Sequence, residues 1–217
     1  MFQFPPLPPV TSAHRQVAFA FAFAFIAIEL ACQASDLGLA WPGLRWDLYR
    51  QFAFLDPWWE RLMAGERAPV QVWWSLLSYS FLHGGLTHLA LNCAAFLGLS
   101  LVVLRIFGTR LYLLFYLVTA VGGAVTYGWL ADAEGPMVGV SGVVFGFLGV
   151  LKYAEFAFIT RRRGEGSMRK FASSLFALLM VNVVISVALS GMLAWQTHLG
   201  GFVAGWVAAW AVVPQLR

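Results

Sequence analysis

Long runs of apolar residues, broken by short charged or glycine- and proline-containing segments, constrain this chain more than any other feature of its sequence. A bilayer core about 30 Å thick is crossed by a helix of about 20 apolar residues. Stretches that approach this length occur at 17–34, 76–104, 111–130, 137–159, 171–192 and 197–213. Because lipid offers no hydrogen-bond partners, each stretch has to satisfy its own backbone as a helix. The sequence therefore predicts an all-α, polytopic membrane bundle of six transmembrane helices.

Composition supports this interpretation and bounds the domain organisation. Of the 217 residues, 60% are hydrophobic and 11% are charged, which is unlike a soluble globular domain. The stretch 76–104 contains the break His83-Gly84-Gly85, so we expect its membrane crossing to begin near Leu86. No segment outside the apolar stretches is large enough to fold alone. We therefore predict a single membrane domain over residues 1–217.

Basic residues are distributed unevenly between the two sides of the predicted bundle. One side carries Arg15, Arg105, Arg110, Arg161, Arg162, Arg163, Arg169, Lys170 and Arg217, whereas the arginines of the other side lie among acidic residues in 35–75. Cytoplasmic segments of membrane proteins are enriched in lysine and arginine. We therefore expect both termini in the cytoplasm, with 1–15 as a cytoplasmic segment and the first helix retained. This orientation also explains the basic loop at 161–170, which indicates no nucleic-acid partner.

The segment 35–75 is the longest connection and is expected on the outer side. Its aromatic residues stand among prolines and charges, and they include Trp41, Trp46, Tyr49, Trp58, Trp59, Trp73 and Trp74. Amphipathic rings of this kind prefer the lipid headgroup region. We expect this outer interfacial loop to lie partly submerged in the membrane surface.

A small set of polar residues lies inside the apolar stretches or at their ends: His83, His88, Asn92, Ser141 and His198. A polar group in a membrane helix is costly to insert, so each one needs a partner or a role. His88 and Asn92 are four residues apart and project from the same helix face. With both termini inside, all of these residues lie in the outer half of the bilayer at a similar depth.

Glycines on the fourth and sixth stretches predict that these two helices pack closely. The glycines are Gly146, Gly149, Gly201 and Gly205. Small residues let helix backbones approach in lipid, and ordinary packing would by itself explain them. Close packing would also bring the Ser141 hydroxyl within hydrogen-bond reach of the His198 imidazole. In that arrangement a base can activate a serine nucleophile.

The start of the fourth helix has the features of an oxyanion site. The first backbone N–H groups of a helix have no partner within it and lie at the positive end of its dipole. The Ser141 N–H, with side-chain donors from His88 and Asn92, would stabilise an oxyanion, which is a large contribution in acyl transfer. Gly139 would let the chain bend into the helix, and Gly142 would leave room for a substrate carbonyl.

In this order, the segments HGGLTHLALN (83–92), GVSG (139–142) and HLGGFVAG (198–205) resemble the rhomboid family of intramembrane serine proteases. The resemblance covers residues 70–213. It implies a six-helix core of the bacterial type, with a cavity open to the outer side, in a bacterial cytoplasmic membrane. It also implies cleavage of single-span membrane proteins near the outer end of their span, without a cofactor.

The resemblance also implies a role for each polar residue. Ser141 and His198 would form a catalytic dyad. The oxyanion site would comprise His88, Asn92 and the Ser141 N–H, while His83 would have a structural or oxyanion-adjacent role.

Two positions depart from many bacterial members of that family. Trp74-Ser75 stands where they have Trp-Arg, so an arginine contact of the first loop is absent. Phe145 stands where they have a tyrosine that stacks on the catalytic histidine. Because no carboxylate is placed to orient His198, we expect packing against Phe145 to hold the imidazole.

A metal site is a second interpretation of the histidines, since imidazole is a common zinc ligand. The chain has no HExxH motif, and the spacing of His83 and His88 turns them to different helix faces. Of the possible carboxylates, Glu155 is expected to pair with Lys152 near the inner surface. Glu29 is expected to snorkel or to face the cavity. No metal is therefore expected.

Functions from other classes stay open at this point. A transporter uses similar buried polar groups, but near the bilayer midplane and on broken helices. A rhomboid-like protein without the dyad would be a non-catalytic binding protein, and a transpeptidase or sorting relative would share the whole site. The presence of both Ser141 and His198 favours a serine endopeptidase.

Overall fold

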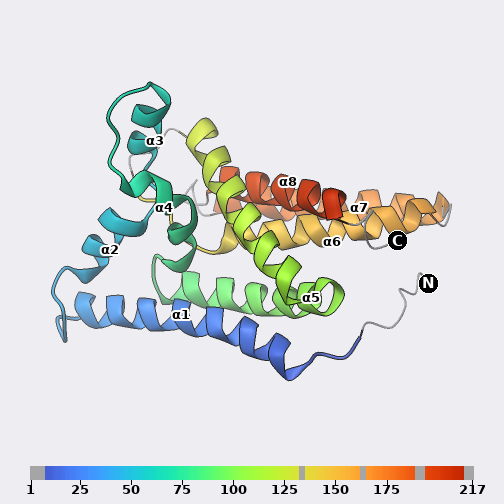
Figure 1. Cartoon of the computed structure of the whole chain (residues 1–217), viewed down its shortest axis with the longest axis horizontal. Coiled ribbons are helices and arrows are strands. Elements are labelled where there is room, and N and C mark those ends of the chain that lie inside the picture. The colour runs from blue at the N-terminus through green and yellow to red at the C-terminus, as the bar shows by residue number, and fades with distance from the viewer. Residues whose placement is uncertain (1–7, 132–134, 162–164, 189–193, 213–217) are drawn as a thin grey trace.

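The structure is a computed structural model that describes residues 8–131, 135–161, 165–188 and 194–212 (Figure 1). The long helices are α1 (Ser12–Asp36), α5 (Leu86–Leu130), α6 (Ser141–Arg161), α7 (Glu165–Ala188) and α8 (Trp195–Val212). The short helices are α2 (Leu44–Phe52), α3 (Asp56–Met63), α4 (Gln71–Ser78) and the 3-10 helix η1 (Tyr79–Phe81). One isolated β-bridge, between Phe54 and Met137, accompanies them in the described ranges. The prediction of an all-α membrane fold is confirmed.

The helices agree with the predicted spans except at one connection. Helices α1, α6, α7 and α8 match the first, fourth, fifth and sixth spans, although the predicted ends at 192 and 213 lie outside the described residues. Helix α5 begins at Leu86, as expected, and contains the second and third spans. The predicted spans leave 105–110 between them, whereas in the structure the two helical halves of α5 meet at a kink at Gly108, with φ 75° and ψ 172°. Glycine adopts this conformation readily, so the chain turns at Gly108. The second half of α5 then runs back across the bundle (Figure 1).

Three of the described helices, α1, α5 and α6, are long and apolar enough to cross a membrane by length and composition. Helix α8 is shorter, with 18 residues, and its first turn carries Gln196, Thr197 and His198. Helix α5, with 45 residues, is about twice as long as one membrane crossing requires. Together these helices form a membrane-embedded bundle, as predicted.

The segment 35–75 is folded into helices α2, α3 and α4, which gather at one end of the bundle (Figure 1). Trp41, Trp46 and Trp73 in this segment are exposed. Trp59 is instead buried, because its ring packs against Gly128 of α5. The segment therefore contributes both to the surface and to the core.

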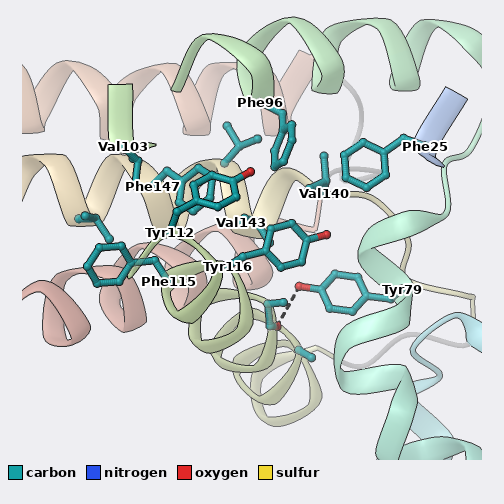
Figure 2. Packing of buried hydrophobic residues seen from close by; sticks show 14 of the residues in the cluster. Phe25, Tyr79, Phe96, Val103, Tyr112, Phe115, Tyr116, Val140, Val143 and Phe147 are labelled. Atoms are coloured by element: carbon teal, nitrogen blue, oxygen red, sulfur yellow. Dashed lines mark hydrogen bonds between the residues drawn. The ribbon is translucent and has the colours of Figure 1, made fainter. Parts of the chain in front are cut away.

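An aromatic core lies between α1, α5 and α6 (Figure 2). The Phe96 ring packs against Phe25 at 5.2 Å and against Phe147 at 6.1 Å between centroids. The buried hydroxyl of Tyr79 donates to the Ala120 carbonyl at 3.0 Å, which satisfies its need for a partner. This bond fixes the segment just before α5 to the second half of that helix.

Helices α6 and α8 meet backbone to backbone at their glycines. A Cβ atom at Gly201 would overlap the Gly142 carbonyl, and one at Gly205 would overlap the Gly146 carbonyl. The predicted close packing of these helices is confirmed. Because α6 and α8 are in contact here, Ser141 of α6 and His198 of α8 lie next to each other.

Gly205→Ala is expected to lower the free energy of unfolding by about 1–3 kcal/mol, because the added methyl group forces the two backbones apart. Gly98→Ala is a matched control, since a Cβ there meets nothing within 4 Å. It should leave stability unchanged or raise it by up to about 1 kcal/mol through helix propensity. Unfolding in detergent, followed by tryptophan fluorescence, measures both. Equal effects of the two substitutions would contradict the packing account.

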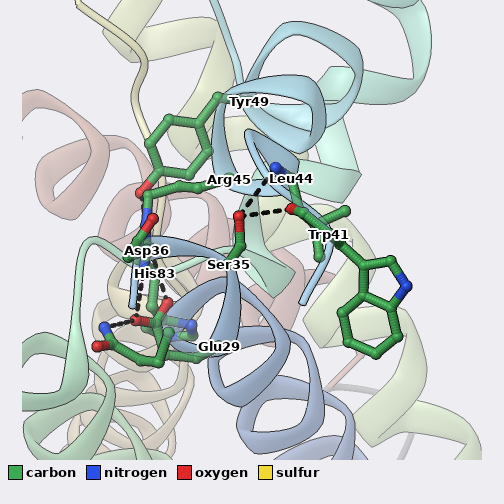
Figure 3. A network of polar contacts seen from close by, with 9 residues as sticks. Glu29, Ser35, Asp36, Trp41, Leu44, Arg45, Tyr49 and His83 are labelled. Carbon is green, nitrogen blue, oxygen red and sulfur yellow. Dashed lines mark hydrogen bonds and ion pairs between the residues drawn. The ribbon is translucent and has the colours of Figure 1, made fainter. Parts of the chain in front are cut away.

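A buried ion pair fastens α2 to α1 (Figure 3). The side chain of Glu29 is 1% exposed, and its Oε1 lies 2.9 Å from Arg45 Nη2. Arg45 Nη1 and the Tyr49 hydroxyl donate to the His83 carbonyl at 3.0 and 2.9 Å. Glu29 therefore does not snorkel, because its carboxylate is buried in a pair with Arg45 of α2. The network also anchors the turn that leads into α5.

Candidate active site

Ser141 is the first residue of α6, and the chain before it bends sharply. Gly139 has a φ of 120°, a conformation that residues with a side chain rarely adopt. The Gly139 N–H donates to the Tyr79 carbonyl at 3.1 Å, and residue 137 is bridged to Phe54. These bonds hold the approach to Ser141, so that Gly139 has the bending role expected of it.

The structure brings Ser141 and His198 together. His198 lies in the first turn of α8 and is 3% exposed. Its Nε2 is 2.9 Å from Ser141 Oγ. The Phe145 ring, one helical turn after Ser141, stacks on the imidazole with centroids 4.2 Å apart and planes 9° apart. A hydroxyl that touches an imidazole nitrogen in this way can lose its proton to it.

The other imidazole nitrogen has a partner that the sequence analysis missed. His198 Nδ1 lies 2.8 Å from the Asn182 side-chain oxygen on α7. The expectation that packing alone orients His198 is therefore incomplete. Asn182 carries the same signal in the sequence as the other polar residues, since it is an amide within the apolar run FALLMVNVV (176–184).

His88 has a defined tautomer in this structure. Its Nδ1 accepts the Gly84 backbone N–H at 3.2 Å. A neutral imidazole has one acceptor and one donor nitrogen, so Nε2 carries the proton. A Cβ built on Gly139 would come within 2.9 Å of that Nε2. The His88 donor is therefore directed at the backbone just before Ser141.

Asn92 stands one turn further along α5 and faces the same backbone. Its Nδ2 donates to the His88 carbonyl at 3.1 Å, which uses one of its two amide protons. A Cβ on Gly139 would lie 3.8 Å from this nitrogen. His88 and Asn92 thus converge on Gly139 rather than on the Ser141 side chain. The donors of both residues and the N–H groups at the start of α6 surround one small region.

His83 is a buried structural neighbour of this region, with 1% exposure. Its ring packs against Phe25 at 5.6 Å and against His88 at 5.3 Å between centroids. The Phe81 backbone lies near the ring, but neither ring nitrogen makes a hydrogen bond of good geometry to a described residue. Its carbonyl receives the Arg45 and Tyr49 donors, so His83 links the outer network to His88.

Gly142 lies against α8 and η1 with no room for a side chain of its own. A Cβ there would collide with the Thr197 methyl group and approach the Tyr79 hydroxyl at 3.0 Å. Glycine is therefore required at this position for packing. Gly142 allows close contact with Gly201 on α8, and its effect on the site is through the placement of that helix.

Lys152 and Glu155 lie further along α6, about three to four turns after Ser141. Lys152 Nζ and Glu155 Oε2 form the predicted pair at 2.7 Å. In the part of the chain that the structure describes, no three His, Cys, Asp or Glu side chains gather as a metal ion would require.

The comparison with known families agrees with the order of these motifs. A model of the Rhomboid domain matches residues 70–215, which is more than half of the chain. The chain belongs to the rhomboid family. The resemblance drawn from the three motifs is confirmed, and the matched residues contain every candidate site residue.

Relatives of this rhomboid chain occur in a bacterium and in a plant. Rhomboid protease GluP of Bacillus subtilis (strain 168) is 31% identical over 140 residues, covering 64% of this chain and 26% of that protein. RHOMBOID-like protein 4 of Arabidopsis thaliana is 29% identical over 144 residues, covering 64% and 34%. RHOMBOID-like protein 5 of the same plant is 28% identical over 135 residues, covering 61% and 41%. The chain thus matches less than half the length of each of these relatives.

One of the two departures from many bacterial rhomboids has a structural explanation. Ser75 is 1% exposed, and its hydroxyl donates to the Val72 carbonyl at 2.9 Å within α4. An arginine there would have to bury its charge, which is costly without a partner. The outer segment is instead fastened by Arg45 and by a bond of 2.7 Å from Trp74 Nε1 to the Gln51 carbonyl.

Proposed function

We propose that this chain is an intramembrane serine endopeptidase that cleaves single-span membrane proteins near the outer face of the bilayer. The observation that carries the proposal is the 2.9 Å contact between Ser141 Oγ and His198 Nε2, at the end of two helices locked together by glycines. Membership of the rhomboid family and the name of the relative GluP support a protease.

In the first step His198 Nε2 takes the proton of the Ser141 hydroxyl while Oγ attacks the carbonyl carbon of a substrate peptide bond. A tetrahedral intermediate forms, and its negative oxygen needs donors that are already in place. The Nε2–H of His88, the second amide proton of Asn92 and the Ser141 N–H are the donors that converge beside Gly139. Ser141 and His198 thus act as nucleophile and base.

In the second step the carbon–nitrogen bond breaks and His198 gives its proton to the departing amine. An acyl-enzyme remains on Ser141. Water then loses a proton to His198 Nε2 and attacks the acyl carbon, and the proton returns to Ser141 Oγ as the carboxylic acid leaves. No metal or cofactor is needed, because every proton moves through His198.

The orientation of the bundle follows from charge. The basic residues at 105–110 and 161–170 flank the helix ends opposite Ser141. By the positive-inside rule both termini are cytoplasmic and the site opens to the outer side. The protein then resides in a bacterial cytoplasmic membrane, and its substrates are single-span proteins that reach the site from lipid.

Cleavage of a reconstituted substrate tests the proposal. The chain and a single-span model protein with a glycine near its outer end are placed in phosphatidylcholine vesicles, and the products are identified by mass spectrometry. Hydrolysed fragments from a cut near the outer end support an endopeptidase. Fragments joined to a second amine indicate a transpeptidase. An intact substrate, across a panel of such sequences, contradicts the proposal.

Asn92→Ala is expected to lower kcat by about 10²-fold with KM little changed, because an oxyanion donor acts mainly in the transition state. Leu91→Ala is a matched control, since the Leu91 side chain is exposed on the same helix. It should retain the wild-type kcat. Steady-state cleavage in the same vesicles measures both variants, and an unchanged kcat in Asn92→Ala would remove Asn92 from the oxyanion site.

A further inference from the structure

We infer that Asn182 of α7 is a positioning residue that selects the tautomer of His198 and thereby prepares its Nε2 to accept the Ser141 proton. This inference rests on the proposed function and adds a third member to its dyad. It is carried by the 2.8 Å contact between Asn182 Oδ1 and His198 Nδ1.

The direction of the two hydrogen bonds on His198 follows from the amide. A side-chain amide oxygen can only accept, so the nitrogen that faces it must carry the ring proton. Neutral imidazole has one such proton, which leaves Nε2 with a free lone pair. That nitrogen is the one at 2.9 Å from Ser141 Oγ. Without the amide, the ring could equally place its proton on Nε2 and lose its capacity as a base.

The hydrogen bond to His198 explains why a polar residue stands at position 182 of α7. Its neighbours on α7 are exposed apolar residues, namely Leu179, Val181, Val183 and Val184. An amide among lipid-facing residues is unfavourable unless it finds a partner. The amide finds one in His198, across the gap between α7 and α8.

Among the residues that the structure describes, the hydrogen-bond partners of the His198 ring are Asn182 and Ser141, and neither is a carboxylate. His88, at the start of α5, is the titratable group that acts on it across the site. On α6 the titratable residues begin at Lys152, and on α7 they lie at 165–170, both toward the other end of the bundle. Helix α8 carries no acidic or basic residue besides His198. Asn182 is thus a neutral partner, which orients the ring without adding charge.

A second contact of α7 supplies a control. About two turns before Asn182 on the same helix, Ser174 Oγ accepts a hydrogen bond from Lys152 Nζ of α6 at 2.8 Å. Ser174→Ala removes a bond between α6 and α7 far from His198. If Asn182 only fastens α7 to the bundle, the two positions should respond alike. If it positions His198, only changes at Asn182 should alter the chemistry of Ser141.

The experiment measures the second-order rate of labelling by a fluorophosphonate probe as a function of pH, on the full chain in detergent. Asn182→Leu should lower the rate at least about tenfold, as expected when a general base loses its correct protonation state. Asn182→Asp should raise the midpoint of the acid limb by about one pH unit, since a nearby negative charge favours the imidazolium. Labelling by this variant is then lost at a higher pH than in the wild type. Ser174→Ala should retain the wild-type rate within about twofold.

The outcomes separate the inference from the proposed function. A wild-type chain that the probe does not label contradicts the proposed function itself. A wild type that is labelled, with the same rate and midpoint in both Asn182 variants, overturns the role of Asn182 alone. Asn182→Leu also changes packing and so tests folding as well. Asn182→Asp keeps nearly the same size, and the midpoint of its acid limb therefore decides whether Asn182 acts on His198. If the Asn182 variants and Ser174→Ala lose labelling rate to the same extent, with no change of midpoint, Asn182 only attaches α7 to the bundle.

Discussion

Ser141→Ala is expected to abolish cleavage of a single-span substrate, with turnover reduced by at least about 10⁴-fold, because no other group replaces the attacking oxygen. His198→Ala should have an effect of similar size, since Ser141 Oγ then has no base at 2.9 Å. Both rates are measured in vesicles at saturating substrate. The double substitution should be no slower than either single one, because residues that act as a unit do not contribute additively.

Both substitutions need a control for folding. Both variants should still unfold in one cooperative thermal transition in detergent, since the glycine contacts that hold α6 against α8 stay intact. Residual turnover within about tenfold of the wild type in either variant would contradict the catalytic assignment. Loss of turnover together with loss of the folded state would point instead to a structural role.

Glu29→Gln is expected to lower the free energy of unfolding by about 3–5 kcal/mol, the cost of breaking a buried ion pair on one side. The side chain of Arg45 is only 12% exposed, and without Glu29 its charge stays beside the His83 carbonyl. Equilibrium unfolding in mixed detergent measures the change. The double variant Glu29→Gln with Arg45→Met should recover part of the loss, because it removes both charges.

Asp36→Asn is the matched control for this prediction. Asp36 also contacts Arg45, at 2.7 Å from Nε, but its side chain is 43% exposed. Exposed ion pairs contribute about 0–1 kcal/mol, so this variant should unfold almost as the wild type does. Equal destabilisation by Glu29→Gln and Asp36→Asn would mean that burial does not govern this network.

The parts of the fold that depend on local chemistry could be predicted from the sequence. Apolar length located the helices, and the pair Gly84-Gly85 located the start of α5 at Leu86. The charged residues at 105 and 110 located the break between the second and third spans, but not the residue at which the chain turns, which is Gly108. Hydropathy responds to composition over many residues and cannot detect a single left-handed residue.

The contacts between distant side chains could be predicted only where a pattern repeated. Glycine spacing indicated the packing of α6 on α8, and from it the approach of Ser141 to His198. Asn182 and Arg45 were not foreseen as partners, since each is a single polar residue whose partner lies on another helix. Which helix faces which is decided by packing of the whole bundle, and one isolated residue does not contain that information.

The most direct test of the central claim is to identify which residue a serine-directed fluorophosphonate modifies in the detergent-solubilised chain. The labelled protein is digested and the modified peptide is sequenced by mass spectrometry, beside the Ser141→Ala and His198→Ala variants. The account predicts a single adduct on Ser141 that is absent from both variants. Labelling that persists in His198→Ala at the wild-type rate, or a folded wild-type chain that is not labelled although a cavity-directed control reagent reaches Ser141, would contradict an activated Ser141–His198 pair.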